Sequence, residues 1–103
     1  AVDKTVEIPP SYKLEANYPN PFNPSTVISY SLPVRSRVTL TVYNLLGQEV
    51  RTIVDGEQEE KTHSITFDGN GLSSGMYFYR LQATSVTDKR SSFIETKKLV
   101  LIR

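Results

Sequence analysis

The segment from Tyr18 to Thr26, with the sequence YPNPFNPST, constrains the fold of this chain more than any other feature. Its three prolines fix φ and remove three backbone donors, which excludes the segment from helices and from central strands. Each residue before a proline is restricted to extended geometry. We therefore expect a stiff, kinked, polyproline-like segment that holds Tyr18 and Phe22 as fixed aromatic anchors.

Length and composition set the bounds on fold and function. The 103 residues have room for one domain of two packed layers, and 38% hydrophobic content is typical of a globular protein. A formal net charge of +1 gives no argument for nucleic-acid binding. The absence of cysteine excludes disulfides, thiolate zinc sites and cysteine nucleophiles. Residues 1–4 do not resemble a signal peptide, and no apolar run reaches about 18 residues. We expect a soluble domain without a transmembrane segment, which can be a fragment of a larger protein.

Alternation of apolar and polar residues predicts strands and no helix. The links between strands are short, which favours antiparallel pairing because parallel pairs need crossovers of a dozen or more residues. We predict an all-β fold, an immunoglobulin-like antiparallel β-sandwich of about seven strands. The domain is expected to span residues 13–103, behind a polar linker of residues 1–12. The expected strands cover residues 13–16, 26–32, 37–43, 48–54, 63–67, 76–84 and 93–102. The expected inward-facing residues are Ile28, Tyr30, Leu32, Val38, Leu40, Val42, Tyr77, Tyr79, Leu81 and Ala83.

Three polar segments are expected to connect these strands. Asn44 to Gly47 predicts a hairpin turn in which Gly47 takes a positive φ. Residues 55–60 predict a polar loop with Glu57, Glu59 and Glu60 at a solvated tip. Residues 68–71 predict a turn.

Candidate catalytic and metal sites each have a simpler structural interpretation. Residues 71–75, GLSSG, match the G-x-S-x-G nucleophile elbow, but that elbow needs a helix after the serine, whereas a strand follows Ser73. His63, the only histidine, is interpreted as a packed or surface strand residue rather than a general base. Asp68 to Gly71 resembles a calcium loop only weakly, because the closing glutamate is missing. We expect no enzyme activity, no cofactor and no metal.

Charged and aromatic residues suggest candidate contact surfaces. Lysines and arginines near the C-terminal end form a net positive patch, which either protects an edge strand from aggregation or supplies a docking charge. Tyr77 and Tyr79 share the phase of Leu81 and are assigned to the core rather than to a carbohydrate platform. Phe78 points to the opposite face and marks a contact surface if it is exposed. The residues of the positive patch are Lys89, Arg90, Lys97, Lys98 and Arg103.

Five phrases in order resemble the type A C-terminal sorting domain of the bacterial type IX secretion system, also called the Por secretion system. They are YPNPFNPST, SLP at 31–33, VYNLLGQEV at 42–50, SGMYFYRL at 74–81 and KKLVLIR at 97–103, and the resemblance covers residues 13–103. This domain is similar to the immunoglobulin-like domain of flagellar hook-capping proteins. The chain departs from relatives by having Phe67-Asp68-Gly69 in place of Trp-Asp-Gly and a shorter loop after it.

The resemblance implies a non-catalytic sorting signal attached behind a cargo protein. It implies an outer-membrane translocon and a sortase-like peptidase as partners, a route through the periplasm of a Gram-negative bacterium, and a cargo that is secreted or held at the cell surface. The residues that the resemblance assigns to translocon recognition are Lys97, Lys98, Leu99, Val100, Leu101, Ile102 and Arg103. The residues that it assigns to the structural family motif are Pro19, Asn20, Pro21, Phe22, Asn23, Pro24, Gly47, Gly75, Tyr77, Tyr79 and Leu81.

Two other classes of function stay open on the sequence. A β-sandwich module that binds carbohydrate or mediates adhesion would need an exposed aromatic platform, whereas the chain has no tryptophan. A structural spacer domain of a secreted enzyme would tolerate any C-terminal sequence.

Overall fold

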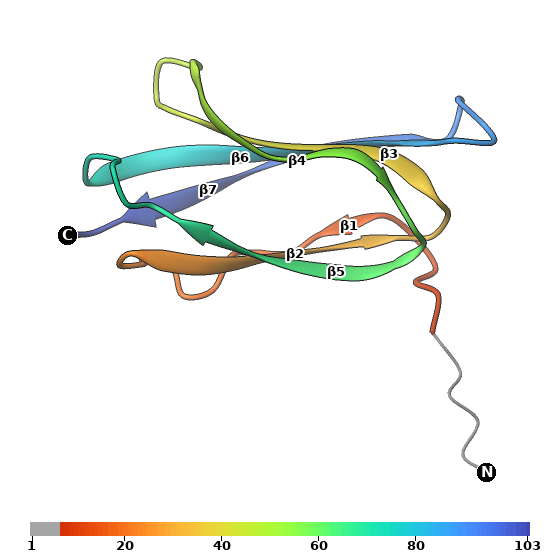
Figure 1. Ribbon diagram of the computed structural model, residues 1–103, viewed down its shortest axis with the longest axis horizontal. Coiled ribbons are helices and arrows are strands. Elements are labelled where there is room, and N and C mark those ends of the chain that lie inside the picture. Colours follow the sequence, from red (N-terminus) through yellow and green to blue (C-terminus); the bar gives the residue numbers. More distant parts are fainter. Residues whose placement is uncertain (1–6) are drawn as a thin grey trace, which may run out of the picture.

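Two antiparallel sheets pack face to face in the computed structural model, which describes residues 7–103 (Figure 1). The smaller sheet has the order β1-β2-β5, and the larger has the order β4-β3-β6-β7. The described residues contain no helix, so the predicted all-β sandwich of seven strands is confirmed. The strands are β1 Lys13–Leu14, β2 Ser25–Leu32, β3 Ser36–Tyr43, β4 Glu49–Gln58, β5 Lys61–Asp68, β6 Gly75–Ser85 and β7 Ser92–Leu101.

The core lies between the two sheets and is built from alternate residues of each strand, because successive side chains point to opposite faces. All ten side chains that alternation placed inward are buried, none more than 8% exposed. Cross-strand register stacks them in rows: Leu40 lies opposite Leu81, and Val42 lies opposite Tyr79. The predicted phase of the strands is thereby confirmed.

The predicted polar loop at residues 55–60 is wrong, because β4 continues to Gln58 and only Glu59 and Glu60 connect it to β5. Asp55 and Glu57 of this stretch belong to the outer face of β4. Arg37 Nη2 lies 2.7 Å from Asp55 Oδ1, and Arg35 Nε lies 3.2 Å from Glu57 Oε1. The turn at Asn44 to Gly47 is as predicted, with Gly47 at φ 80°.

The proline-rich segment reverses direction instead of extending as a polyproline-like rod. Tyr18 and Val27 exchange two backbone hydrogen bonds of 3.0 and 2.9 Å, and the bonds preceding all three prolines are cis. Phe22 is 2% exposed and packs edge-on against Phe67 with centroids 6.1 Å apart, whereas Tyr18 is 80% exposed. The expectation of an aromatic anchor is therefore right for Phe22 and wrong for Tyr18. Gly69 makes room for Phe22, since a Cβ there would lie 3.1 Å from the ring.

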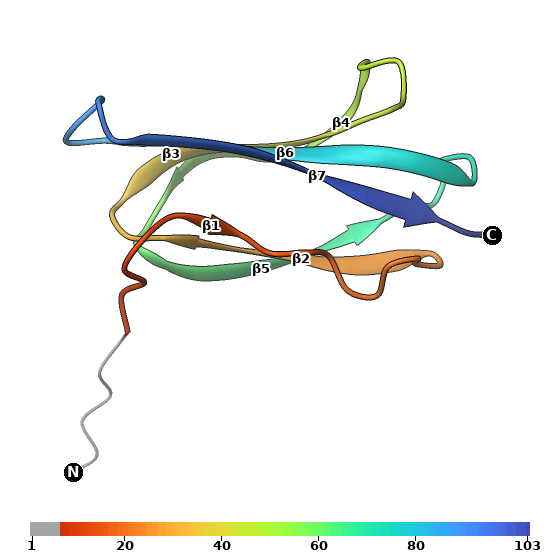
Figure 2. The same cartoon turned by 180° about the vertical axis from the view of Figure 1, so that it is seen from behind.

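The ends of the described chain lie at opposite ends of the sandwich (Figures 1 and 2). The segment before β1 lies at one end, where Tyr12 stacks on Phe93 with ring centroids 5.6 Å apart. Arg103 lies at the other end, beyond β7. Figure 2 shows β7 running along the border of the larger sheet toward that end.

Candidate functional site

The C-terminal strand β7 is an edge strand whose last residues are firmly packed. Among the strands of residues 7–103 it pairs only with β6, in a register that runs without a shift from Gly75–Leu101 to Thr84–Ser92. Leu99 and Leu101 point inward and are fully buried. Two of the seven residues assigned to recognition by the translocon thus belong to the core.

The free side of β7 is capped at its C-terminal end by the proline-rich segment. Phe22 N donates to the Val100 carbonyl at 2.9 Å, and Ile102 N donates to the Phe22 carbonyl at 3.0 Å. Val100 N donates to Asn20 Oδ1 at 3.0 Å. Because backbone groups of alternate residues point to the same side of a strand, those of Ile94, Thr96 and Lys98 point to this side too. No strand of the described chain pairs with them.

The two adjacent lysines of β7 lie in different environments. Lys97 shares the inward phase of Leu99 and lies 3.3 Å from Glu95 Oε2. Its position on the inner side of an open edge is typical of charges that oppose strand-to-strand aggregation. Lys98 is exposed on the outer face and has no carboxylate within ion-pair distance among residues 7–103. Of the pair, only Lys98 offers an uncompensated charge to a partner.

Arg103 stabilises the loop before β6 instead of extending freely from the strand. Its Nε donates to the Leu72 carbonyl at 2.8 Å and its Nη2 to the Gly69 carbonyl at 2.9 Å. Its backbone N donates to Ser74 Oγ at 3.1 Å. These three bonds tie the end of β7 to the loop before β6.

The family-motif residues meet in two places. At the capped end of β7, the Pro24 carbonyl accepts a 2.7 Å bond from Gly69 N, and Pro19 accepts one of 2.8 Å from Thr26 Oγ1. In the core, the Tyr79 hydroxyl donates to the Glu15 carbonyl at 2.8 Å and accepts from Asn17 N at 2.9 Å. The remaining residues of the motif are Asn20 and Phe22, which cap β7; Tyr77 and Leu81, which are buried; Gly47 and Gly75, which have positive φ; and Pro21 and Asn23, which are exposed.

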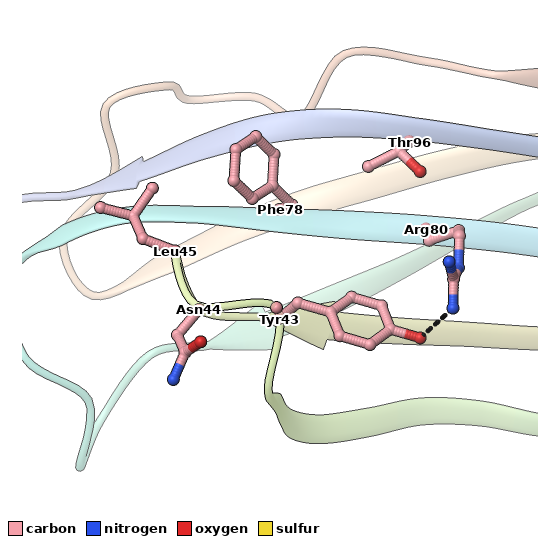
Figure 3. Close-up of a pocket in the computed structure, with 7 residues that line it drawn as sticks. Tyr43, Asn44, Leu45, Phe78, Arg80 and Thr96 are labelled. Atoms are coloured by element: carbon pink, nitrogen blue, oxygen red, sulfur yellow. Dashed lines mark hydrogen bonds between the residues drawn. The ribbon is translucent and has the colours of Figure 1, made fainter.

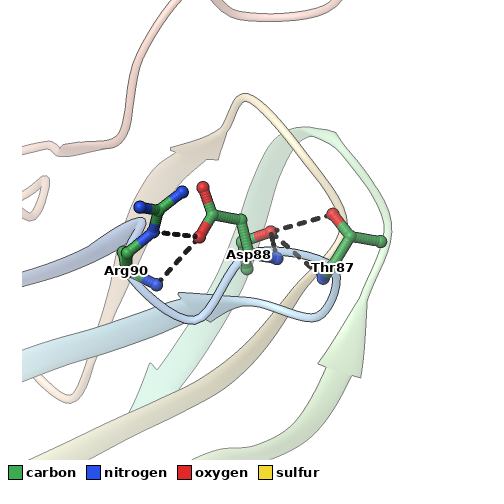
Figure 4. Close-up of polar contacts among 4 residues, drawn as sticks. Thr87, Asp88 and Arg90 are labelled. Carbon is green, nitrogen blue, oxygen red and sulfur yellow. Dashed lines mark hydrogen bonds and ion pairs between the residues drawn. The ribbon is translucent and has the colours of Figure 1, made fainter.

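The predicted positive patch is not one surface, because its members lie at both ends of β7. Lys89 and Arg90 belong to the β6–β7 turn, where Arg90 Nε lies 3.3 Å from Asp88 Oδ1 (Figure 4). Ser85 Oγ accepts a 3.1 Å bond from Asp88 N and fixes the turn. A strand of ten residues spans about 30 Å, which separates these charges from Arg103.

The candidate catalytic and metal-binding residues occupy structural positions. Ser73 is exposed and precedes a strand, and its carbonyl accepts a 2.7 Å bond from the Tyr77 hydroxyl. His63 stacks on Tyr30 with centroids 5.2 Å apart. Asp68 Oδ1 accepts from Asn70 N at 2.9 Å within the predicted turn. Among the described residues, no group of three or more His, Asp or Glu side chains is placed to hold a metal ion. Within the same residues, no helix is long and apolar enough to cross a membrane.

Sequence reasoning missed the structural contacts of two residues: Asn17 was not singled out, and Asn20 was assigned to the family motif without its partner. Asn17 is buried, and its Nδ2 donates to Thr26 Oγ1 at 3.0 Å, across the base of the proline-rich segment. Asn20 caps the backbone of Val100, eighty positions along the chain. Their place inside and just before the YPNPFNPST phrase was the available indication of a local role.

Comparison with known families gives a match over residues 16–100 to the family described as the secretion system C-terminal sorting domain. No match was found among curated proteins or among solved structures. Members of this family are in general non-catalytic, are attached to a cargo protein, and are recognised by a secretion system that exports the cargo out of the cell or to its surface. The five sequence phrases, the seven-stranded sandwich and this match agree: the chain belongs to the family of C-terminal sorting domains that direct attached proteins through the type IX secretion system.

Proposed function

We propose that the outer-membrane translocon recognises this domain through β7 and the residues that end it, Lys97 to Arg103, after the cargo has reached the periplasm. The observation that carries the proposal is that the free edge of β7 is covered at one end and open along the rest. Asn20 and Phe22 occupy the edge at Val100 and Ile102, and the described chain leaves it open at Ile94, Thr96 and Lys98. An open edge accepts an extended segment of a partner as an added strand, with main-chain hydrogen bonds supplying affinity.

The charges and apolar residues of β7 support the same role. Lys98 is exposed and has no ion-pair partner among residues 7–103, and a cation of this kind guides and orients a partner of opposite charge. Leu99 and Leu101 hold the strand against the core, so the edge is presented in one fixed register.

We further propose that residues 1–12 are a linker to the cargo and that residues 13–103 are the unit that the machinery recognises. A sortase-like peptidase then cuts before Lys13. Residues 7, 8, 10 and 11 are exposed, which suits access by a peptidase. Mass spectrometry of the released cargo would place the new C-terminus in this segment, and a cut inside the sandwich would contradict the assignment.

The export experiment fuses a fluorescent protein before Ser11 and measures fluorescence in the periplasm, at the cell surface and in the medium of a bacterium with the type IX system. Deletion after Glu95 is expected to abolish export, but it also removes the core residues Leu99 and Leu101. The decisive variant is Thr96→Pro, which removes one backbone donor on the open side of β7. Proline is tolerated on an edge strand where its nitrogen faces solvent.

Thr96→Val is the matched control, because it keeps the backbone donor. We expect the Thr96→Pro fusion to stay in the periplasm and the Thr96→Val fusion to be exported, provided that both purified domains unfold at the urea concentration of the wild type. Export of a folded Thr96→Pro fusion at the wild-type level would rule out strand addition at this edge.

We also propose that the domain has no hydrolase activity. Ser73 lies in a loop that leads into β6, and no helix of the described chain supports it as a nucleophile elbow requires. A serine-directed fluorophosphonate is expected to leave Ser73 unlabelled. Labelling that disappears on heat denaturation would contradict this.

A further inference from the structure

A hollow of about 250 Å³ opens on the outer face of the larger sheet, at the end where β7 finishes (Figure 3). Tyr43, Leu45, Phe78, Arg80 and Thr96 line it. They come from β3, from the turn that follows it, and from β6 and β7. Of the family-motif residues, Gly47 alone also lines it.

Strand register forces these side chains onto one face. Tyr43 lies opposite Phe78, which lies opposite Lys98, so one row crosses three strands. The next row places Arg80 opposite Thr96. Because alternate residues such as Tyr79 fill the core, these rows must face outward.

Arg80 is held in place by a neutral partner, the side chain of Tyr43. Its guanidinium lies 4.8 Å from the centroid of the Tyr43 ring, and its Nη2 donates to the Tyr43 hydroxyl at 2.6 Å. Figure 3 shows the two side chains joined in this way beside Phe78 and Leu45. A guanidinium has five N–H donors, of which residues 7–103 engage one.

The charge at the hollow is uncompensated within the described chain. Neither Arg80 nor Lys98 forms an ion pair with a carboxylate of residues 7–103, in contrast to Arg37 at the far end of the same face, which pairs with Asp55. The carboxylate nearest in register is Glu49, opposite Tyr43 on β4, and it accepts a 2.7 Å bond from Thr52 Oγ1.

Part of the wall of the hollow is apolar. Phe78 and Tyr43 present ring surface, and Leu45 is 64% exposed at the rim. Two cations next to exposed apolar surface are complementary to a carboxylate that is flanked by apolar groups. A carboxylate at the guanidinium would gain charge-assisted hydrogen bonds that a neutral amide does not make as strongly.

We propose that this hollow binds an acidic side chain of an extended segment of the secretion machinery, flanked in that segment by apolar side chains. The inference rests on the proposed function, since the partner is the one that docks on β7. Thr96 connects the two features, because its side chain lines the hollow and its backbone lies on the open edge of β7. Lys98 lies next to the hollow, because it is opposite Phe78 in register, and its backbone lies on the same open edge.

The test titrates the purified domain with a terminally blocked hexapeptide that alternates Glu and Val, followed by amide chemical shifts in NMR spectra. The control probe replaces Glu by Gln. We expect the Glu peptide to shift the amides of Tyr43, Phe78 and Arg80 and to bind about tenfold more tightly than the Gln peptide, as a charge-assisted hydrogen bond implies. Higher salt weakens binding of the Glu peptide.

Two pairs of variants separate the hollow from charge in general. Arg80→Met is expected to weaken binding of the Glu peptide about tenfold, and Lys98→Met about threefold. Arg37→Met and Arg35→Met remove cations that pair with carboxylates of β4, away from the hollow, and are expected to leave binding unchanged. Urea midpoints equal to that of the wild type confirm that each variant folds.

Any one of three results would overturn the inference. The amides around the hollow do not shift, the Glu and Gln peptides bind equally well, or Arg80→Met and Arg37→Met weaken binding by the same factor. The proposed function is tested separately: it is contradicted if the folded Thr96→Pro fusion is exported at the wild-type level. If Thr96→Pro blocks export while the peptide does not bind at the hollow, recognition at β7 stands and the hollow is excluded.

Discussion

Replacing Tyr79 by Phe removes the hydroxyl group that ties the strand β6 to the segment after β1. This hydroxyl donates to the Glu15 carbonyl at 2.8 Å and accepts from Asn17 N at 2.9 Å. Asn17 is 3% exposed, so its orphaned N–H would have no access to water, at a cost of about 1–3 kcal/mol. Glu15 is partly exposed and its carbonyl can be rehydrated, so that lost bond costs about 0.5–1.5 kcal/mol.

We therefore expect Tyr79→Phe to lower the free energy of unfolding by about 2–4 kcal/mol, a large part of the roughly 5–15 kcal/mol typical of a domain. Urea unfolding followed by circular dichroism measures it. Tyr77→Phe is the matched control, because the Tyr77 hydroxyl donates only to the carbonyl of exposed Ser73, and its loss is expected to cost about 0.5–1.5 kcal/mol. A Tyr79→Phe domain within about 0.5 kcal/mol of the wild type would refute the reasoning, as would equal losses in the two variants.

Three further perturbations test the packing and its dependence on pH. Leu40→Ala is expected to cost about 2–5 kcal/mol in a chemical melt because Leu40 is fully buried, and a change under about 0.5 kcal/mol would place the side chain at the surface. Phe22→Ala is expected to lower the free energy of unfolding by about 3–5 kcal/mol and to raise proteolysis near the proline-rich segment. Tyr18→Ala is the control and is expected to change neither, because Tyr18 is exposed. Equal effects of the two variants would contradict the anchoring role of Phe22. Burial raises the pKa of Tyr30 and of Tyr79 from 10.0 to about 12, so the folded state keeps phenolic protons that the unfolded chain releases. Stability is then fully present below about pH 10 and falls as pH rises toward 12, which melts on either side of pH 10 would detect, and Tyr79→Phe should flatten that fall.

The strands and their inward faces could be predicted from the sequence because alternation is a local property. Val38, Leu40 and Val42 repeat at period two within a single strand, and burial follows once one face meets the other sheet. The end of β4 could not be predicted in this way. Asp55 and Glu57 are polar residues that suit a loop as well as the outer face of a strand, so the sequence pattern does not distinguish the two. Only the pairing of this stretch with β3 shows that it is a strand.

The candidate site could be predicted only in part for the same reason. Alternation places Lys97 and Lys98 on opposite faces of β7, as the structure has them. The partners that give other residues their roles lie far along the chain: Asn20 meets Val100, and Arg103 meets Gly69. Contacts over such separations depend on how the two sheets are brought together, which no local pattern encodes.

The position of the two ends of the described chain bears on how one sorting domain can serve a cargo and a translocon at once. The segment before β1 meets the body at Tyr12, whose ring stacks on Phe93 at the start of β7. The capped end of β7 lies at the other end of the sandwich (Figure 1), where Arg103 donates to the Leu72 carbonyl in the loop before β6. The hollow lies on the part of the larger sheet nearer that end, because Phe78 in its wall is opposite Lys98. A cargo joined through residues 1–12 would therefore approach the sandwich from the side away from these features. Forming β7 needs no contact between its open edge and the segment that joins the cargo. Under the proposed recognition at β7, this edge and its charges therefore remain accessible whichever protein precedes the domain.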